Sequence, residues 1–156
     1  MTKKSLFIKT AFAAGLLGLA AGGYGLYLWN MPHRDVQAAR VDYTLTADAL
    51  VAEYLADATA ADAKYLDAEG QSRVLAITGR VHALRVNQAG ETVAVLRGPD
   101  AQAGVACSFT LATNPADDAL KIGDTITVKG VIRAGAQYSD VLESYTDAVV
   151  EKCALL

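Results

Sequence analysis

Cys107, Cys153 and His82 are the side chains with the most versatile chemistry in the second half of this sequence. A thiol can act as a nucleophile, bind a metal or form a disulfide, and an imidazole can transfer protons or bind a metal. Structural zinc sites need four such ligands at short spacing, whereas no third cysteine or nearby histidine accompanies either cysteine. We therefore predict no metal site and no cofactor, and we interpret His82 as a surface or structural residue.

The sequence also lacks the arrangements that enzymes use for nucleophilic or phosphoryl-transfer chemistry. It contains no Gly-x-Ser-x-Gly element and no serine with an obvious base. Pro32-His33-Arg34-Asp35 resembles a kinase catalytic loop, but the chain has no glycine-rich phosphate loop and no room for a kinase domain. We therefore expect no catalytic residues and predict that the protein is not an enzyme.

The charge distribution argues against a nucleic-acid partner. The chain has a net charge of -3, and residues 72–156 contain 8 Lys and Arg against 9 Asp and Glu. Binding of single strands needs a basic groove and exposed aromatic rings. The arginines of the region that reads as the first two strands could still form a local basic strip: Arg73, Arg80, Arg85 and Arg97. We nevertheless expect no nucleic acid to bind.

An uncharged run from Thr10 to Trp29 indicates a membrane anchor. Twenty helical residues span about 30 Å, the thickness of the hydrocarbon core. Three lysines precede the run, which predicts a cytoplasmic N-terminus at 1–9, a single transmembrane helix at 10–30 and an exported remainder. A signal peptide cleaved near Ala20-Ala21-Gly22 is the alternative. The apolar stretch continues through Trp29, beyond what a cleaved peptide needs, and therefore favours the uncleaved anchor.

Residues in and just after this run have expected roles in the membrane. Small residues at every fourth position could let a partner helix approach closely: Ala14, Gly18 and Gly22. Gly and Ala are also common in membrane helices without such a partner. Aromatic and basic residues at the far end are expected at the membrane interface: Tyr24, Tyr27, Trp29, His33 and Arg34. The expected partners are therefore membrane lipid and another membrane protein.

Residues 31–45 read as a juxtamembrane linker and residues 46–66 as one amphipathic helix. Thr46 is a good N-cap, and Leu45 and Leu50 are spaced as a hydrophobic staple. Apolar residues follow at spacings of three and four: Leu50, Tyr54, Leu55, Ala58, Ala61 and Tyr65. We expect this stripe to pack against the domain that follows.

From residue 72 the pattern changes to short β-rich runs separated by turn residues. The predicted strands are Val74–Val86, Thr92–Leu96, Val105–Leu111, Asp124–Arg133 and Val149–Leu155. Gly79 interrupts the long first strand and indicates a bulge. Residues 134–147 read as an extended loop with one helical turn around 140–145. Five strands in this order predict an all-β OB-fold barrel over 72–156, preceded by the amphipathic helix and the transmembrane helix.

Several short motifs occur together and in order along this region. They are Ile77-Thr78-Gly79-Arg80-Val81, Gly104-Val105-Ala106-Cys107-Ser108-Phe109, the segment from Gly123-Asp124 to Gly130, and Glu151-Lys152-Cys153. The set resembles the tRNA_anti-like OB-fold family of small bacterial exported or membrane-anchored proteins, over Thr46 to Leu156. The resemblance implies a bacterial inner-membrane protein whose C-terminal domain is periplasmic, and it supplies no catalytic residues.

The same fold brings the two cysteines within reach of each other. The third and fifth strands of an OB barrel are neighbours, so Cys107 and Cys153 could approach the separation that a disulfide needs. Export would supply an oxidising compartment. We predict a structural disulfide, with two buried free thiols as the alternative.

These observations predict a non-catalytic accessory or assembly subunit of a membrane protein complex. The alternative is an exported domain that binds a small ligand or an oligosaccharide through the barrel face and the loops around Asn87 and Pro99. Which small ligand would bind is unknown from the sequence. A nucleic-acid-binding OB domain is the least favoured reading.

Overall fold

The computed structural model describes residues 20–29, 35–116 and 119–156. It consists of two compact units, Met1–Arg34 and Asp35–Leu156. In the first unit, residues 20–29 form a helix whose residues are all exposed. The predicted span 10–30 therefore lies only partly within the described residues. Among all the described residues, no helix is long and apolar enough to cross a membrane.

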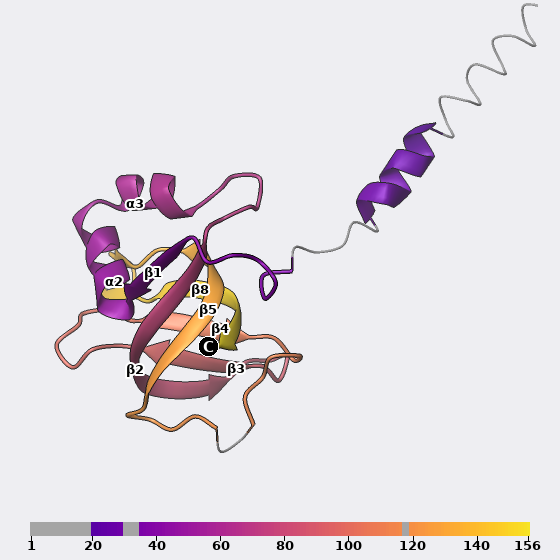
Figure 1. Ribbon diagram of the computed structural model, residues 1–156. Helices are drawn as coiled ribbons and strands as arrows, with labels where there is room; N and C mark the ends of the chain where they lie inside the picture. The colour runs from indigo at the N-terminus through magenta and orange to yellow at the C-terminus, as the bar shows by residue number, and fades with distance from the viewer. Residues whose placement is uncertain (1–19, 30–34, 117–118) are drawn as a thin grey trace, which may run out of the picture. The chain divides into compact units, whose positions relative to one another are not determined.

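The second unit is built on a closed barrel of five strands (Figure 1). The strands are β2 (Val74–Val86), β3 (Thr92–Leu96), β4 (Val105–Phe109), β5 (Thr125–Ala134) and β8 (Ala148–Leu155). They pair in the order β2-β3-β4-β8-β5, and pairing of β5 with β2 closes the barrel. All these pairs are antiparallel except β4 with β8. This arrangement confirms the predicted OB fold.

The long strand β2 serves two halves of the barrel. Residues 74–80 pair with β5, and residues 81–86 pair with β3. The irregularity predicted at Gly79 lies instead between Val81 and Ala83, where the register with β3 shifts. Gly79 lies near the changeover, where a Cβ atom would come within 2.9 Å of both Ala47 Cβ and Leu96 Cβ. Only glycine lets the helical layer and β3 approach the strand this closely, which explains the interruption seen in the sequence.

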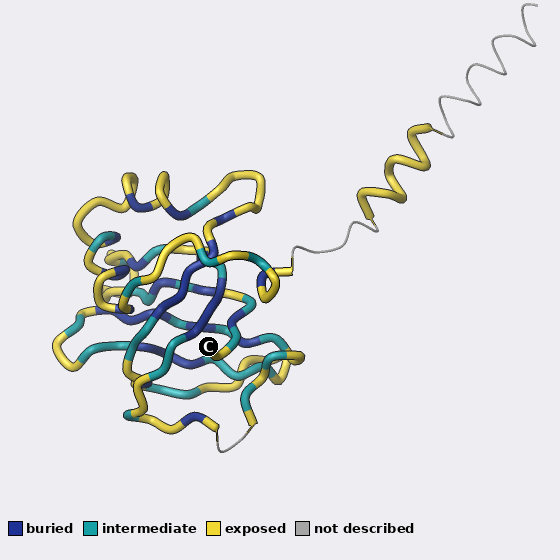
Figure 2. Tube along the Cα trace, in the orientation of Figure 1, coloured by how far each residue is buried: buried dark blue, intermediate teal, exposed yellow. Residues whose placement is uncertain are grey.

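The core fills the barrel and the space under the helices, and buried stretches run along the barrel strands (Figure 2). Its largest fully buried side chains come from all five barrel strands and from the two helices of residues 47–65. Among them are Leu50, Tyr65, Leu75, Ile77, Leu96, Phe109, Ile132 and Val150. Residues 74–77 of β2 are buried in succession, with no alternation. A strand covered on both faces reads as a continuous apolar run. Leu75 and Ile77 pack in the core together with the helices, and Val74 and Ala76 are buried on the opposite face of the strand.

The folded domain begins earlier than predicted. Asp35 starts a turn in which its carboxylate accepts hydrogen bonds from the N–H groups of Gln37 and Ala38. Val36 is buried, and β1 (Tyr43–Thr46) pairs in parallel with β2. Residues 35–45, predicted as linker, therefore belong to the domain; residues 30–34 lie outside the described residues.

Two helices replace the single one predicted over 46–66. They are α2 (Ala47–Ala56) and α3 (Ala58–Tyr65). Thr46 caps α2 as predicted, because its hydroxyl accepts from Ala49 N–H at 3.2 Å. Asp57 adopts an extended backbone and its carboxylate accepts from Ala60 N–H, which ends the first helix and caps the second. The two helices lie at one side of the barrel in Figure 1.

A small hairpin replaces the helical turn predicted within 134–147. Its strands are β6 (Gln137–Ser139) and β7 (Ser144–Thr146). Tyr138 and Tyr145 stand opposite each other with ring centroids 5.1 Å apart in an edge-to-face contact. This cross-strand aromatic pair stabilises a hairpin too short to be stable alone.

Candidate functional site

The two cysteines lie together in the barrel core as buried free thiols, which corrects the predicted disulfide. Their strands are neighbours, but Cys107 is in register with Val150, and Cys153 is in register with Phe109. A hydrogen bond with Cys107 and burial raise the pKa of the Cys153 thiol well above its ordinary value. A thiol held neutral in this way is a poor nucleophile, so the pair acts as core packing.

A second group of interacting ionisable residues connects the two helices. Lys64 Nζ and the Tyr65 hydroxyl both donate to the Glu53 carboxylate at 2.8 Å. These hydrogen bonds lower the pKa of Glu53, and the bond to Glu53 raises the pKa of Lys64. The Lys64 ammonium also lies 4.7 Å from the Tyr65 ring centroid. Each charge therefore already has its partner, and the arrangement serves structure better than catalysis.

Two open cavities flank the loop between β3 and β4. The larger, of about 430 Å³, lies between α2 and residues 98–102 and is lined by Asp48, Leu55 and Asp100 among others. Asp48 fixes this loop by accepting a hydrogen bond from Gly98 N–H at 3.0 Å. The smaller, of about 250 Å³, is lined by Arg80, Val81, His82, Arg97, Pro99, Ile122 and Gly123.

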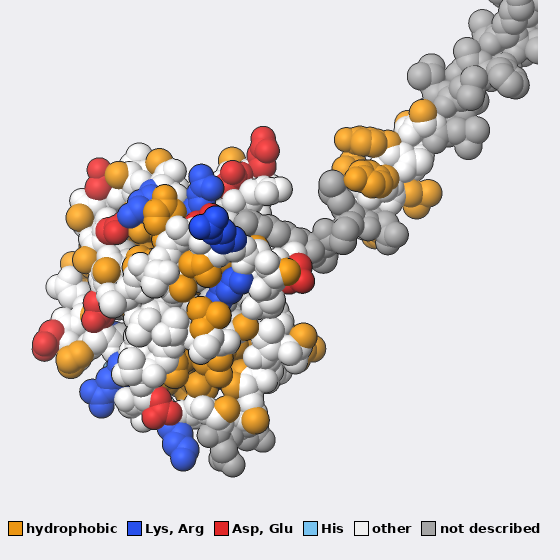
Figure 3. All heavy atoms as spheres, viewed as in Figure 1, with side chains coloured by type: hydrophobic (Ala, Val, Ile, Leu, Met, Phe, Trp, Pro, Cys, Tyr) orange, Lys and Arg blue, Asp and Glu red, His pale blue; other side chains and the backbone are white. Residues whose placement is uncertain are grey.

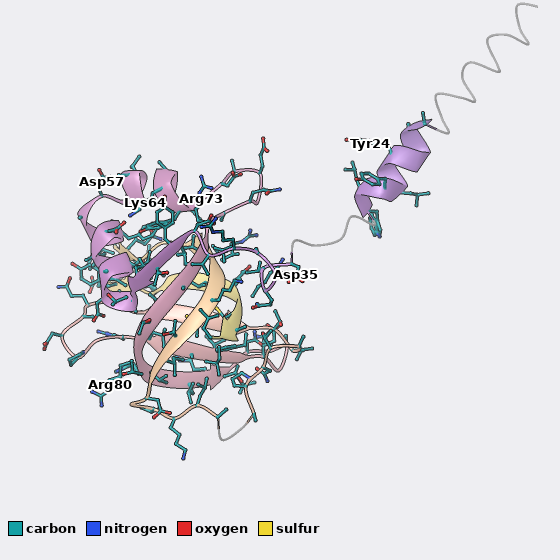
Figure 4. The ribbon with its side chains drawn as sticks, viewed as in Figure 1. Tyr24, Asp35, Asp57, Lys64, Arg73 and Arg80 are labelled. Carbon is teal, nitrogen blue, oxygen red and sulfur yellow. The ribbon has the colours of Figure 1, made fainter. Side chains whose placement is uncertain are left out.

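The four arginines that could have formed a basic strip, Arg73, Arg80, Arg85 and Arg97, do not lie together in the structure. Arg80 and Arg97 share the smaller cavity, whereas Arg85 lines a different one. Arg73 and Arg80 lie toward opposite ends of the barrel (Figure 4). Lys and Arg side chains are likewise separated into groups in the space-filling view, with one group at the lower edge where Arg80 is labelled (Figure 3). No continuous basic groove runs over the described part of this face.

The loop around Asn87 uses its polar groups internally. The Asn87 side-chain oxygen accepts from the N–H groups of Ala89 and Glu91, and its Nδ2 donates to the Glu91 carboxylate. These bonds shape the turn between β2 and β3 and leave this side chain little capacity for a ligand. Of the two loops expected to bind a ligand, the one containing Pro99 is therefore the better candidate.

Sequence analysis missed an exposed apolar surface at the β6–β7 hairpin. Val141 is 93% exposed and Leu142 is 64% exposed in the turn, beside the half-exposed rings of Tyr138 and Tyr145. The sequence does contain a signal for this surface: two adjacent apolar residues, Val141 and Leu142, stand between the charged residues Asp140 and Glu143. We call these four residues, Tyr138, Val141, Leu142 and Tyr145, the hairpin patch.

Half of the eight residues assigned to the membrane lie outside the described residues. Ala14, Gly18, His33 and Arg34 fall outside them. Gly22, Tyr24, Tyr27 and Trp29 lie on the helix 20–29; nothing lies within 4 Å of a Cβ added at Gly22, and the three aromatic side chains are exposed (Figure 4 labels Tyr24). Within the described ranges, no group of three or more His, Cys, Asp or Glu residues could hold a metal ion.

Comparison with known proteins places the chain in a family. No curated protein matches the sequence. The sequence model of the tRNA_anti-like family matches residues 18–144, which is more than half of the chain; the match includes the helix 20–29 and ends at the first residue of β7. The strand order described above and this match agree with the resemblance noted from the motifs. The chain belongs to the tRNA_anti-like family.

Proposed function

We propose that this protein is a membrane-anchored, exported OB-fold module that acts as a non-catalytic accessory or assembly subunit of a membrane protein complex. The hairpin patch is the observation that carries the proposal. Two large aliphatic residues exposed to solvent at the tip of an ordered hairpin, Val141 and Leu142, are typical of a surface that a partner covers.

The hairpin is held in place by the rest of the domain. The α2 residue Tyr54 packs so closely against Gly135, just before β6, that a Cβ at this glycine would collide with its ring. Tyr138 and Tyr145 then brace the two short strands. A support of this kind presents Val141 and Leu142 in one arrangement, which reduces the entropy lost on docking.

The N-terminal sequence supports location at a membrane. The uncharged run ends at Trp29, and the folded domain already begins at Asp35. An anchor followed by so few residues would keep the domain near the bilayer, where subunits of a membrane complex are within reach. The preceding lysines favour export of the domain.

The test is copurification of the full-length protein from its native membrane in mild detergent. The double variant Val141→Asp/Leu142→Asp should lose a partner that copurifies with the wild-type protein in fixed proportion. Val86→Asp is the matched control, because Val86 is also apolar and exposed (71%) but lies on β2. It should retain the partner.

Two results would count against the proposal. Migration of the wild-type protein only as a free monomer on native gels would show that it is not part of a stable complex. Retention of the same partner by the double variant would show that the hairpin patch is not the docking surface.

A further inference from the structure

We propose that the cavity lined by Arg80, His82 and Arg97 binds a phosphoryl group, presented by a small molecule or by a lipid headgroup. The proposal is independent of the hairpin patch, because none of these residues belongs to it. The cavity lies where the end of the first part of β2, the residue after β3 and the turn before β5 meet.

The backbone places the two arginines opposite each other. Arg97 N–H donates to Arg80 C=O at 2.9 Å, one step beyond the pairing of Val81 with Leu96. Like charges directly opposite across two strands destabilise a sheet. An anion bound between the two guanidinium groups would turn this repulsion into attraction.

Neither guanidinium is neutralised within the described part of the chain. The ion pairs there join Lys64 to Glu53 and Arg133 to Glu151, and they leave both cavity arginines out. The protein as a whole is acidic, with a net charge of -3, yet the residues that line this cavity include no Asp or Glu. Two unpaired arginines that share one cavity are therefore a local exception to the charge of the molecule.

Nearby acids have other contacts or positions. The Asp124 carboxylate, one residue beyond the cavity, accepts a hydrogen bond from Lys121 N–H at 3.1 Å. Asp100 lines the larger neighbouring cavity together with Asp48. The charged residues that line the smaller cavity are therefore both arginines, Arg80 and Arg97.

The two arginines are set up differently. Arg97 Nε donates to Ala101 C=O at 2.8 Å, which orients its guanidinium and leaves the terminal nitrogens available. Arg80 Nη2 lies near Gly123, 3.6 Å from the position that a Cβ would occupy there. Gly123 has a φ of +100°, so the turn before β5 favours glycine and leaves space beside the guanidinium.

This set of donors suits a phosphoryl group better than a carboxylate. Two guanidinium groups and one imidazole offer donors from several directions, and a phosphoryl group has three terminal oxygens and up to two negative charges. A carboxylate would satisfy one arginine fork and leave the second cation unpaired. A cavity of about 250 Å³ that is open to solvent could admit the headgroup while the rest of the ligand stays outside.

The first test is titration of the full-length protein, in neutral detergent, with inorganic phosphate followed by calorimetry and by NMR of the arginine side chains. We expect saturable binding that Arg80→Gln weakens by about tenfold, the effect of losing one charge-assisted contact. Arg80 makes no side-chain hydrogen bond within the described residues, so this variant should fold. Arg97→Lys keeps the charge, loses the fork and should also weaken binding.

Arg85→Gln is the matched control, since it removes the same charge from the same strand outside this cavity. It should bind phosphate as the wild-type protein does. Absence of saturable phosphate binding, or an equal loss of affinity in Arg85→Gln and Arg80→Gln, would overturn the proposal.

A second titration distinguishes the two sources of the group. Glycerol 3-phosphate serves as the soluble probe, and neutral phosphatidylcholine vesicles containing phosphatidic acid serve as the lipid probe. Displacement of inorganic phosphate by the soluble probe alone assigns the site to a small molecule. Displacement by the vesicles, reduced by Arg80→Gln, assigns it to a headgroup.

Discussion

At the scale of single residues, Tyr54 combines two demands that conflict. Its ring is 3% exposed and stacks on Tyr65 with centroids 6.2 Å apart. Its hydroxyl oxygen is buried and has no hydrogen-bond partner among the described residues. Burial, with the nearby Asp62 carboxylate, raises the pKa of Tyr54, so the hydroxyl stays neutral. The ring stabilises the domain, whereas the hydroxyl opposes folding.

Tyr54→Phe should therefore leave the free energy of unfolding unchanged or increase it by up to about 1 kcal/mol, because the variant no longer buries an unsatisfied hydroxyl. Tyr54→Ala should lower it by about 3–5 kcal/mol, since it removes the ring. Urea unfolding of both variants and the wild-type protein checks the pair. A loss above 1 kcal/mol in the Phe variant would show that the hydroxyl has a partner in solution.

Glu53 should make stability depend on pH. Its pKa is lowered from the ordinary value of 4.5 by hydrogen bonds from Lys64 and Tyr65. A carboxylate with a lowered folded-state pKa stabilises the protein above its unfolded-state pKa, and this contribution is lost as pH falls through the folded-state pKa.

Glu53→Gln should accordingly be less stable than the wild-type protein at pH 7, and the difference should shrink at acidic pH. The loss should be small and reduced further by salt, because both side chains of the ion pair are about 40% exposed. Thermal unfolding at neutral and acidic pH, each at low and high salt, provides the measurement. A difference that is independent of pH would assign the effect to packing.

At the scale of elements, the patterns that repeat along the chain predicted the barrel well. The bounds of β2 and β3 were predicted correctly, because apolar β-branched runs end at clear turn residues. The strand β1 was missed since it has only four residues and pairs with a strand about thirty positions away. The helix break at Asp57 was hidden by an apolar stripe that continues beyond it.

The candidate sites were less predictable than the strands, because they depend on strand register and on contacts between loops. The neighbouring strands of Cys107 and Cys153 follow from the strand order, but their free state depends on a register that spacing does not fix. The cavity shared by Arg80 and Arg97 depends on how the Pro99 loop and the Gly123 turn fold back. Contacts between loops distant in sequence have no periodic signal.

Gly79 offers a test of the close packing between these elements. Gly79→Ala should lower the free energy of unfolding by about 1–3 kcal/mol, because the new methyl group would press against Ala47 and Leu96 in a packed core. Gly22→Ala is the control: nothing lies within 4 Å of the added Cβ there, so unfolding of the domain should not change. Chemical denaturation of the full-length variants measures both. Equal stabilities would show that the helical layer can shift away from β2.

At the scale of the whole molecule, residues 35–46 act as part of the barrel's support. Lys129, only 9% exposed, donates from Nζ to Gln37 C=O at 2.8 Å. Gln37 in turn donates from Nε2 to Lys152 C=O at 2.7 Å. Together with buried Val36, these contacts fix the start of the domain to β5 and β8, so the boundary of the folding unit lies at Asp35 and not at Thr46.

Two truncated chains should therefore differ clearly in their free energy of unfolding. A chain of residues 35–156 should unfold cooperatively with the stability that the domain has in the full-length protein. A chain of residues 41–156 should be less stable by about 2–4 kcal/mol, because it exposes the surface that Val36 covers and leaves the largely buried Lys129 without its hydrogen-bond acceptor. Urea unfolding of the two fragments and the intact protein measures the difference. Within the shorter fragment, Lys129→Met should recover part of the lost stability if the turn contributes mainly by accepting this hydrogen bond. Within the longer fragment, Val36→Ala should reproduce most of the loss if the turn contributes mainly by burial. Equal stability of the two fragments would move the boundary back to β1, and residues 35–40 would then be a tether resting on the barrel.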